Sequence, residues 1–188
     1  MNKINFTPFP ILTTEHLILR QIRIEDLNEF FILKSDERLL KYYNAKAKTY
    51  EEAHRKLQQL NEDIMKNESI TWGITLKSEN KLIGSICFWN ISEENFKAEI
   101  GYELMLNWQG RGIMQAAINS VIEYGFKNMK LQLIEAFPNP KNLKSVKLLE
   151  RNNFISETNF CETGSSNGLI PENVIYSLAN DASKLNPL

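Results

Sequence analysis

Three strand-like segments in succession constrain the fold of this chain more than any other feature of its sequence. Two of them, Trp72 to Lys77 and Leu82 to Ile91, are rich in β-branched and aromatic residues. The four polar residues Ser78 to Lys81 separate them, as in a hairpin loop. The third segment, Ala98 to Leu104, alternates apolar residues with charged or small ones, which is typical of a strand with one buried face. Three strands with short connections predict an antiparallel meander.

Helical patterns precede and follow this meander. Thr49 and Glu52 have the spacing of a capping box, and an apolar stripe with helical periodicity follows them. No linker-like stretch or internal repeat interrupts the order of elements. We therefore expect one α+β domain over residues 1–188, with a central mixed, mostly antiparallel sheet flanked by helices. The stripe is Ala53, Leu57, Leu60 and Ile64; further helices are expected at 26–34, 113–127 and 143–150, and further strands at 15–22, 131–137, 154–158 and 174–179.

Composition excludes several classes of protein. The chain has 188 residues, of which 43% are hydrophobic and 24% charged, and its formal net charge of -1 gives no field to attract nucleic acid or an anionic membrane. No stretch approaches the roughly 20 apolar residues that cross a bilayer, so the sequence predicts a cytoplasmic protein. The two cysteines, Cys87 and Cys161, and the two histidines, His16 and His54, are isolated. We therefore expect no metal site and no disulfide framework.

A turn with two glycines joins the meander to the helix expected at 113–127. Gly110 and Gly112 flank Arg111, directly before the first helical residue. Glycines let the backbone approach a ligand, and the N–H groups at the start of a helix attract phosphate. The turn lacks the ending of a Walker loop and the third glycine of a dinucleotide fingerprint. Two interpretations remain open at this point: a plain tight loop, or a site for the phosphates of a cofactor.

Four separated motifs in order resemble the GNAT superfamily of acetyl-coenzyme A-dependent N-acetyltransferases. Thr14-Glu-His-Leu-Ile-Leu-Arg20 and Glu99-Ile-Gly-Tyr102 resemble segments of the branch that acetylates the N-terminal amines of ribosomal proteins. Gln109-x-x-Gly112 resembles the cofactor turn, and the pattern of Asn142, Ser145 and Phe154 resembles the closing signature. The resemblance covers essentially the whole chain. It implies a GNAT fold and acetyl transfer to a primary amine.

The resemblance also assigns the cofactor contacts. It implies that the strand end presents backbone groups to the pantetheine arm, that the amides of the glycine turn hold the pyrophosphate, and that one asparagine side chain bonds the pantetheine. The asparagine has a second interpretation, a helix N-cap. The cofactor-binding candidates are Leu104, Met105, Leu106, Gln109, Gly110, Arg111, Gly112, Ile113, Met114 and Asn142.

Two positions depart from the family pattern. Met114 stands where the signature ends in a small residue, and its side chain either packs on the sheet or crowds the pyrophosphate. Asn153 replaces the usual glycine before the last aromatic residue. Asparagine is the non-glycine residue that best tolerates a left-handed helix end, so we expect that conformation there.

Acetyl transfer needs a base for the amine, donors for the oxyanion and a proton for the departing thiolate. Glu99 is the candidate base, directly or through water, and Glu103 is the alternative on the same strand face. Backbone N–H groups near Leu104 are candidate oxyanion donors. Ser145 is the candidate donor to the thiolate, as the resemblance implies, and Tyr124 is the alternative.

The acceptor is not fixed by these motifs. A protein N-terminus and a small-molecule amine both remain, and a homodimer is one open oligomeric state. A second class of function is a non-catalytic acetyl-coenzyme A sensor or interaction module on the same fold. Release of free coenzyme A thiol distinguishes an enzyme from such a module.

Overall fold

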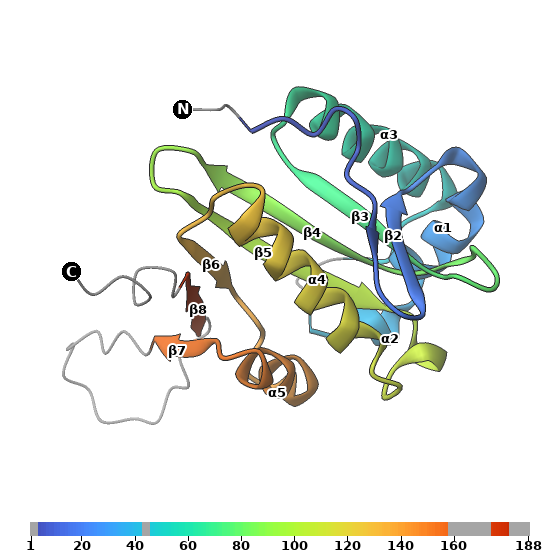
Figure 1. The fold of residues 1–188 in the computed structure, drawn as a ribbon. Coiled ribbons are helices and arrows are strands. Elements are labelled where there is room, and N and C mark those ends of the chain that lie inside the picture. The colour runs from blue at the N-terminus through green and yellow to red at the C-terminus, as the bar shows by residue number, and fades with distance from the viewer. Residues whose placement is uncertain (1–3, 43–45, 158–173, 181–188) are drawn as a thin grey trace, which may run out of the picture.

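The computed structural model describes residues 4–42, 46–157 and 174–180. Within these residues one sheet contains eight strands in the order β1-β2-β3-β4-β5-β6-β8-β7 (Figure 1). The neighbours β5 and β6 are parallel, whereas the other pairs are antiparallel. The predicted α+β class and the mixed, mostly antiparallel sheet are confirmed. The strands are β1 (Leu12–Thr13), β2 (Leu17–Gln21), β3 (Ile70–Leu76), β4 (Leu82–Ser92), β5 (Lys97–Leu104), β6 (Leu133–Ala136), β7 (Ile155–Glu157) and β8 (Ile175–Ala179).

Helices cover both faces of the sheet. Helices α1 and α3 pack together on one face, against β4 and β3, while α4 crosses the other face (Figure 1). Thr49 and Glu52 form the predicted capping box at the start of α3. The short helix α2 and the strand β1 have too few residues to leave a periodic pattern in the sequence. The helices are α1 (Leu27–Ser35), α2 (Glu37–Leu40), α3 (Tyr50–Lys66), α4 (Ile113–Lys127) and α5 (Leu143–Arg151), with 3-10 turns η1 (Ile24–Asp26) and η2 (Leu106–Trp108).

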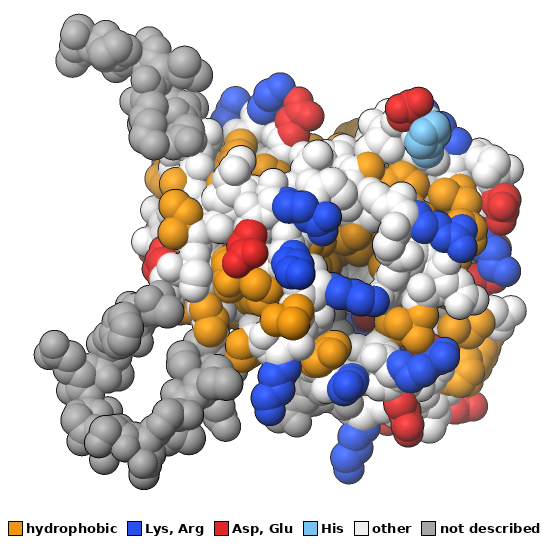
Figure 2. Space-filling model, turned by 90° about the horizontal axis from the view of Figure 1, so that it is seen from below, with side chains coloured by type: hydrophobic (Ala, Val, Ile, Leu, Met, Phe, Trp, Pro, Cys, Tyr) orange, Lys and Arg blue, Asp and Glu red, His pale blue; other side chains and the backbone are white. Residues whose placement is uncertain are grey.

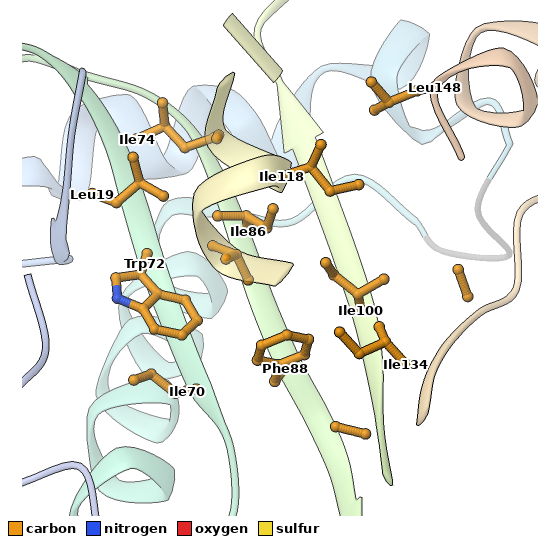
Figure 3. Packing of buried hydrophobic residues seen from close by; sticks show 14 of the residues in the cluster. Leu19, Ile70, Trp72, Ile74, Ile86, Phe88, Ile100, Ile118, Ile134 and Leu148 are labelled. Atoms are coloured by element: carbon orange, nitrogen blue, oxygen red, sulfur yellow. The ribbon is translucent and has the colours of Figure 1, made fainter. Parts of the chain in front are cut away.

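The main hydrophobic core lies between α4 and the sheet (Figure 3). Trp72 of β3 is fully buried, packs edge-on against Phe88 of β4, and donates its indole N–H to the Pro10 carbonyl at 2.7 Å. Ile118 of α4 and Ile100 of β5 continue this core toward α5. A second, smaller cluster lies between α1 and α3. The two clusters hold the middle of the sheet between helices, which makes β5 a firm support for a site.

Burial of the predicted stripe follows the expected pattern. Ala53, Leu57 and Ile64 are buried, and Leu60 packs partly buried against the α1–α3 cluster. No helix among the described residues is both long enough and apolar enough to span a bilayer. Cys161 lies outside the described residues, as does residue 158 at the end of the strand expected at 154–158. The extent of the domain over all of 1–188 stays a prediction.

Candidate active site

Strands β5 and β6 diverge at the centre of the candidate site. Their parallel pairing covers Lys97 to Glu99 on β5 and Leu133 to Glu135 on β6. Strand β6 then ends at Ala136, whereas β5 continues to Leu104 and stays paired with β4. The result is a gap beside the second half of β5, in the middle of a sheet that is otherwise continuous.

The register of β4 and β5 decides which backbone groups point into this gap. The Met105 N–H donates to the Ile83 carbonyl at 3.0 Å. Because hydrogen-bonded residues alternate along an antiparallel pair, the peptide groups of Ile100, Tyr102 and Leu104 point away from β4, toward the β6 side. The Leu104 peptide group therefore points into the gap, a backbone contact between it and a ligand stays a prediction, and the Met105 N–H is already used inside the sheet.

Gln109 closes the end of β5. Its side-chain Nε2 donates to the Leu104 carbonyl at 3.0 Å, and its backbone N–H donates to the Leu106 carbonyl at 3.1 Å. The Met105 carbonyl accepts from the Trp108 N–H at 2.9 Å in the same way. Among residues 104–106, these bonds leave the N–H of Leu104 and that of Leu106 as the backbone donors for a ligand.

The glycine turn places a row of amides at the start of α4. Gly110 and Gly112 have φ of 77° and 75°, a region that glycine enters without strain. No described residue accepts a hydrogen bond from the backbone N–H groups of residues 110–115. A Cβ built on either glycine would meet nothing within 4 Å, so the space over the turn is open. The turn therefore has room and unused donors for an anion.

Cationic side chains flank this turn. The Arg111 guanidinium lies 5.1 Å from the centre of the Trp108 ring. Lys144, on the first turn of α5, donates its Nζ to Gln109 Oε1 at 3.1 Å. Figure 2 shows Lys and Arg side chains gathered around a recess at this end of the molecule. The electrostatic environment of the recess suits a phosphorylated ligand.

The first residues of α4 face the core. Ile113 is buried, and Met114 is partly buried against the main hydrophobic cluster. Of the two interpretations of Met114, packing on the sheet side is the one that the structure has. The Met114 backbone N–H is one of the amides without a described acceptor, and it can bind a ligand wherever the Met114 side chain lies.

Asn142 is the N-cap of α5. Its Oδ1 accepts from the Ser145 backbone N–H at 3.3 Å, which is the helix-capping role weighed from the sequence. A contact between Asn142 and a cofactor stays a prediction. At the other end of this helix, Asn153 has φ of 61°, so the expected left-handed conformation is confirmed.

Ser145 meets a tyrosine that comes from β5. The Ser145 Oγ lies 2.8 Å from the Tyr102 hydroxyl. Burial raises the pKa of Tyr102 to about 12, and the hydrogen bond with Ser145 offsets a part of this effect. The phenol is therefore neutral at physiological pH. Tyr124 is the alternative donor that the sequence offers. Its ring packs edge-on against Trp72 beside the core, with the two ring centres 5.4 Å apart.

The two candidate carboxylates share a strand face but have different partners. Glu99 stands at the last residue of the β5–β6 pairing, and its Oε1 accepts from Asn90 Nδ2 at 2.8 Å. Glu103 is ion-paired with Lys34 and also accepts from Ser85 Oγ at 2.8 Å. Glu103 is thus held by α1, whereas Glu99 lies where the strands separate.

Comparison with known proteins identifies the family. Residues 16–155 match the family described as the acetyltransferase (GNAT) domain. This chain belongs to the GNAT acetyltransferase family. The uncharacterized N-acetyltransferase p20 of Bacillus licheniformis is 32% identical over 168 residues, which are 89% of this chain and 94% of that protein. The GNAT domain thus accounts for most of the chain.

Solved GNAT structures have the same fold. The ribosomal-protein-S5-alanine acetyltransferase of Vibrio fischeri superposes with a TM-score of 0.77 and 27% identity, over 92% of this chain and 98% of that one. The ribosomal L7/L12 α-N-protein acetyltransferase RimL, solved in complex with coenzyme A, gives a TM-score of 0.79 at 21% identity, over 92% and 99% of the two chains.

Sequence reasoning missed two residues of this GNAT site. The sequence shows Tyr102 only as the last residue of a strand motif, and its position beside Ser145 depends on how α5 lies relative to β5. Lys144 carries no pattern of its own, and it reaches the glycine turn through Gln109. One sequence feature could have indicated Tyr102: alternation along β5 places this polar-tipped side chain on the buried face of the strand.

Proposed function

We propose that this GNAT protein transfers the acetyl group of acetyl-coenzyme A to a primary amine. The divergence of β5 from β6, next to the unused amides at the start of α4, is the observation that carries this proposal. A thioester with a long extended arm and a pyrophosphate needs both features together. The solved relative that holds coenzyme A supports the choice of ligand. A location in the cytoplasm stays a prediction.

The protein's own groups fit such a ligand. The amides of residues 110–115 would hold the pyrophosphate, with Arg111 and Lys144 supplying positive charge beside them. The Leu104 N–H points into the gap between the strands and would bond the pantetheine arm. Ile113 and Met114 contribute their backbone, while their side chains stay in the core. When bound, acetyl-coenzyme A supplies an activated acyl group.

Chemistry at the gap needs a base and a hydroxyl donor. Glu99 would accept the proton that the amine loses, directly or through water. Ser145 would hydrogen-bond the departing thiolate. A thiol has a pKa of about 8.5, and aliphatic hydroxyls are much weaker acids, so we assign Ser145 stabilisation of the thiolate rather than complete proton transfer. The thiolate then takes its proton from water.

Both acceptor classes stay within the proposal: a protein N-terminus and a small-molecule amine. The sensor interpretation uses the same cofactor site but assigns no role to the hydroxyls of Tyr102 and Ser145 or to Glu99. A panel of amines, including peptides with free N-termini, distinguishes the enzyme from the sensor through the release of coenzyme A thiol. Turnover with any amine supports the enzyme, and cofactor binding without turnover across the panel would support the sensor.

The base assignment has its own test in Glu99→Gln. This change keeps the shape of the side chain and removes its ability to accept a proton. We expect a loss in kcat of roughly 10²–10⁴, and the loss should shrink at higher pH because more of the amine is already neutral. Glu94→Gln, an exposed carboxylate in the adjacent β4–β5 loop, is the matched control. A wild-type rate for Glu99→Gln over the whole pH range would rule out this base.

A further inference from the structure

The contact between Tyr102 and Ser145 joins the two elements that border the gap. Tyr102 lies on the face of β5 that carries Ile100 and Leu104, and its ring packs partly buried against the main core. Its hydroxyl reaches the first turn of α5, 2.8 Å from Ser145 Oγ and 3.5 Å from the Ser145 carbonyl oxygen. A residue of the strand thus contacts the side chain assigned to the thiolate.

The chemistry of the two hydroxyls favours one direction for this hydrogen bond. A phenol is a stronger acid than an aliphatic alcohol, and so it is the better donor of the two. Both oxygens of Ser145 near the phenol can accept from it. When Tyr102 donates, the Ser145 hydroxyl hydrogen is left to point at another acceptor. When Ser145 donates instead, its hydrogen is used inside the protein.

A serine inside a helix has a competing partner. Its hydroxyl commonly donates to the carbonyl one turn earlier, which holds Oγ against its own helix. Ser145 is the third residue of α5, so no turn of the helix precedes it, and its Oγ lies toward β5 instead. The backbone N–H of Ser145 is fixed separately, by Asn142. Tyr102 is therefore the described side chain that determines the position of the Ser145 hydroxyl.

We propose that Tyr102 is a positioning residue for the acetyl transfer, donating its hydrogen bond to Ser145 Oγ so that the Ser145 hydroxyl hydrogen points at the departing thiolate. This inference rests on the proposed function and assigns Tyr102 no contact with the thioester. A phenol that stays neutral at working pH keeps its hydrogen for this role. No bond is made or broken at Tyr102 in the reaction.

Tyr102→Phe removes the hydroxyl and keeps the ring that packs in the core. A neutral hydrogen bond contributes about 0.5–1.5 kcal/mol, so we expect kcat to fall roughly twofold to twelvefold while KM for acetyl-coenzyme A stays within about twofold. Tyr50→Phe is the matched control, because it also removes one phenol oxygen, which bonds Asn28 Oδ1 of α1 at 3.1 Å on the other face of the sheet. We expect its kcat to match that of the unmodified protein.

A double-mutant cycle with Ser145→Ala separates positioning from a merely structural role. If Tyr102 acts through Ser145, then adding Tyr102→Phe to Ser145→Ala lowers kcat no further. An equal fall of kcat in both backgrounds would overturn the inference, as would a wild-type kcat for Tyr102→Phe alone. If the unmodified protein binds acetyl-coenzyme A and acetylates no amine, the proposed function fails, and the inference fails with it. An equal fall of kcat in both backgrounds, or a wild-type kcat for Tyr102→Phe, overturns only this inference and leaves the proposed function intact.

Discussion

The Arg20 guanidinium and the glycine turn are both rich in N–H donors, and they use them in opposite ways. All five N–H groups of Arg20 are bonded inside the protein, to Asp26, Asn80 and the Gln21 carbonyl. Arg20 and Asp26 are each less than a tenth exposed. At the turn, the amides of residues 110–115 have no acceptor among the described residues, and the space above them is open.

This difference separates a stabilising cluster from a binding site. Buried donors that lack partners cost free energy, so a protein satisfies them unless water or a ligand does so. The Arg20 cluster fixes the β2–η1 connection against the β3–β4 loop. The turn keeps its donors at the surface, where an anion can displace water from them. Changes in the first region should therefore affect folding, and changes in the second should affect ligand binding.

The largest effect should come from Asp26→Asn. Removing one partner of a buried ion pair leaves the other charge uncompensated, which costs about 3–5 kcal/mol of unfolding free energy. The affinity of the folded protein for acetyl-coenzyme A should not change. Urea unfolding and calorimetric titration measure the two quantities. Glu123→Gln, which breaks an exposed pair with Lys127, should cost less than about 1 kcal/mol.

Acid should weaken the same cluster. Burial alone would raise the pKa of Asp26, but hydrogen bonds from Arg20 and from the Arg23 backbone, with their charges, lower it below the ordinary value of 3.8. The carboxylate therefore adds stability in full above that value, and this contribution disappears as pH falls through the folded-state pKa. We expect the gap in stability between the unmodified protein and Asp26→Asn to be constant at neutral pH and to narrow in acid. If the two proteins differed in unfolding free energy by the same amount at neutral and at acid pH, the charge of Asp26 would not be the source of the difference.

The sequence was sufficient for the scaffold because local patterns determine it. The capping box of α3, the hairpin at residues 78–81 and the α4 boundaries depend on neighbouring residues, and all three match the structure. Alternation along β5 correctly put Glu99 and Glu103 on one face. These features need no knowledge of contacts that are distant in sequence.

The site could be predicted only in part, because its partners come from different elements. The sequence puts Glu99 ahead of Glu103 as the candidate base, but it does not show the ion pair that occupies Glu103, because its partner Lys34 lies 69 positions earlier. Tyr102 and Ser145 are 43 positions apart. A motif names the residue types, whereas the packing of α1 and α5 decides which side chains meet.

Gly112→Asp tests the turn with the next largest effect. At about 100 times its dissociation constant, acetyl-coenzyme A should stabilise the unmodified protein by ~2.7 kcal/mol. A carboxylate beside the phosphates should weaken binding at least tenfold, which halves that stabilisation at the same concentration. Gly112→Asn is the control, since asparagine has a similar size and tolerates positive φ without adding charge. If the aspartate variant kept the full stabilisation, the turn would be excluded from the cofactor site.

The smallest effect should come from Lys144→Ala. Lys144 is exposed and is held near the turn by Gln109, so its charge acts on the phosphates through water. Exposed charges contribute at most about 1 kcal/mol, and we therefore expect a two- to fivefold loss of affinity for acetyl-coenzyme A. The loss should disappear in about 1 M salt, where the screening length falls to roughly 3 Å. Lys127→Ala, at the far end of α4, should leave affinity unchanged. A loss of affinity that persisted in high salt would mean that Lys144 acts by holding Gln109 in place and not by its charge. The geometry of the glycine turn would then depend on α5, as its electrostatic environment does.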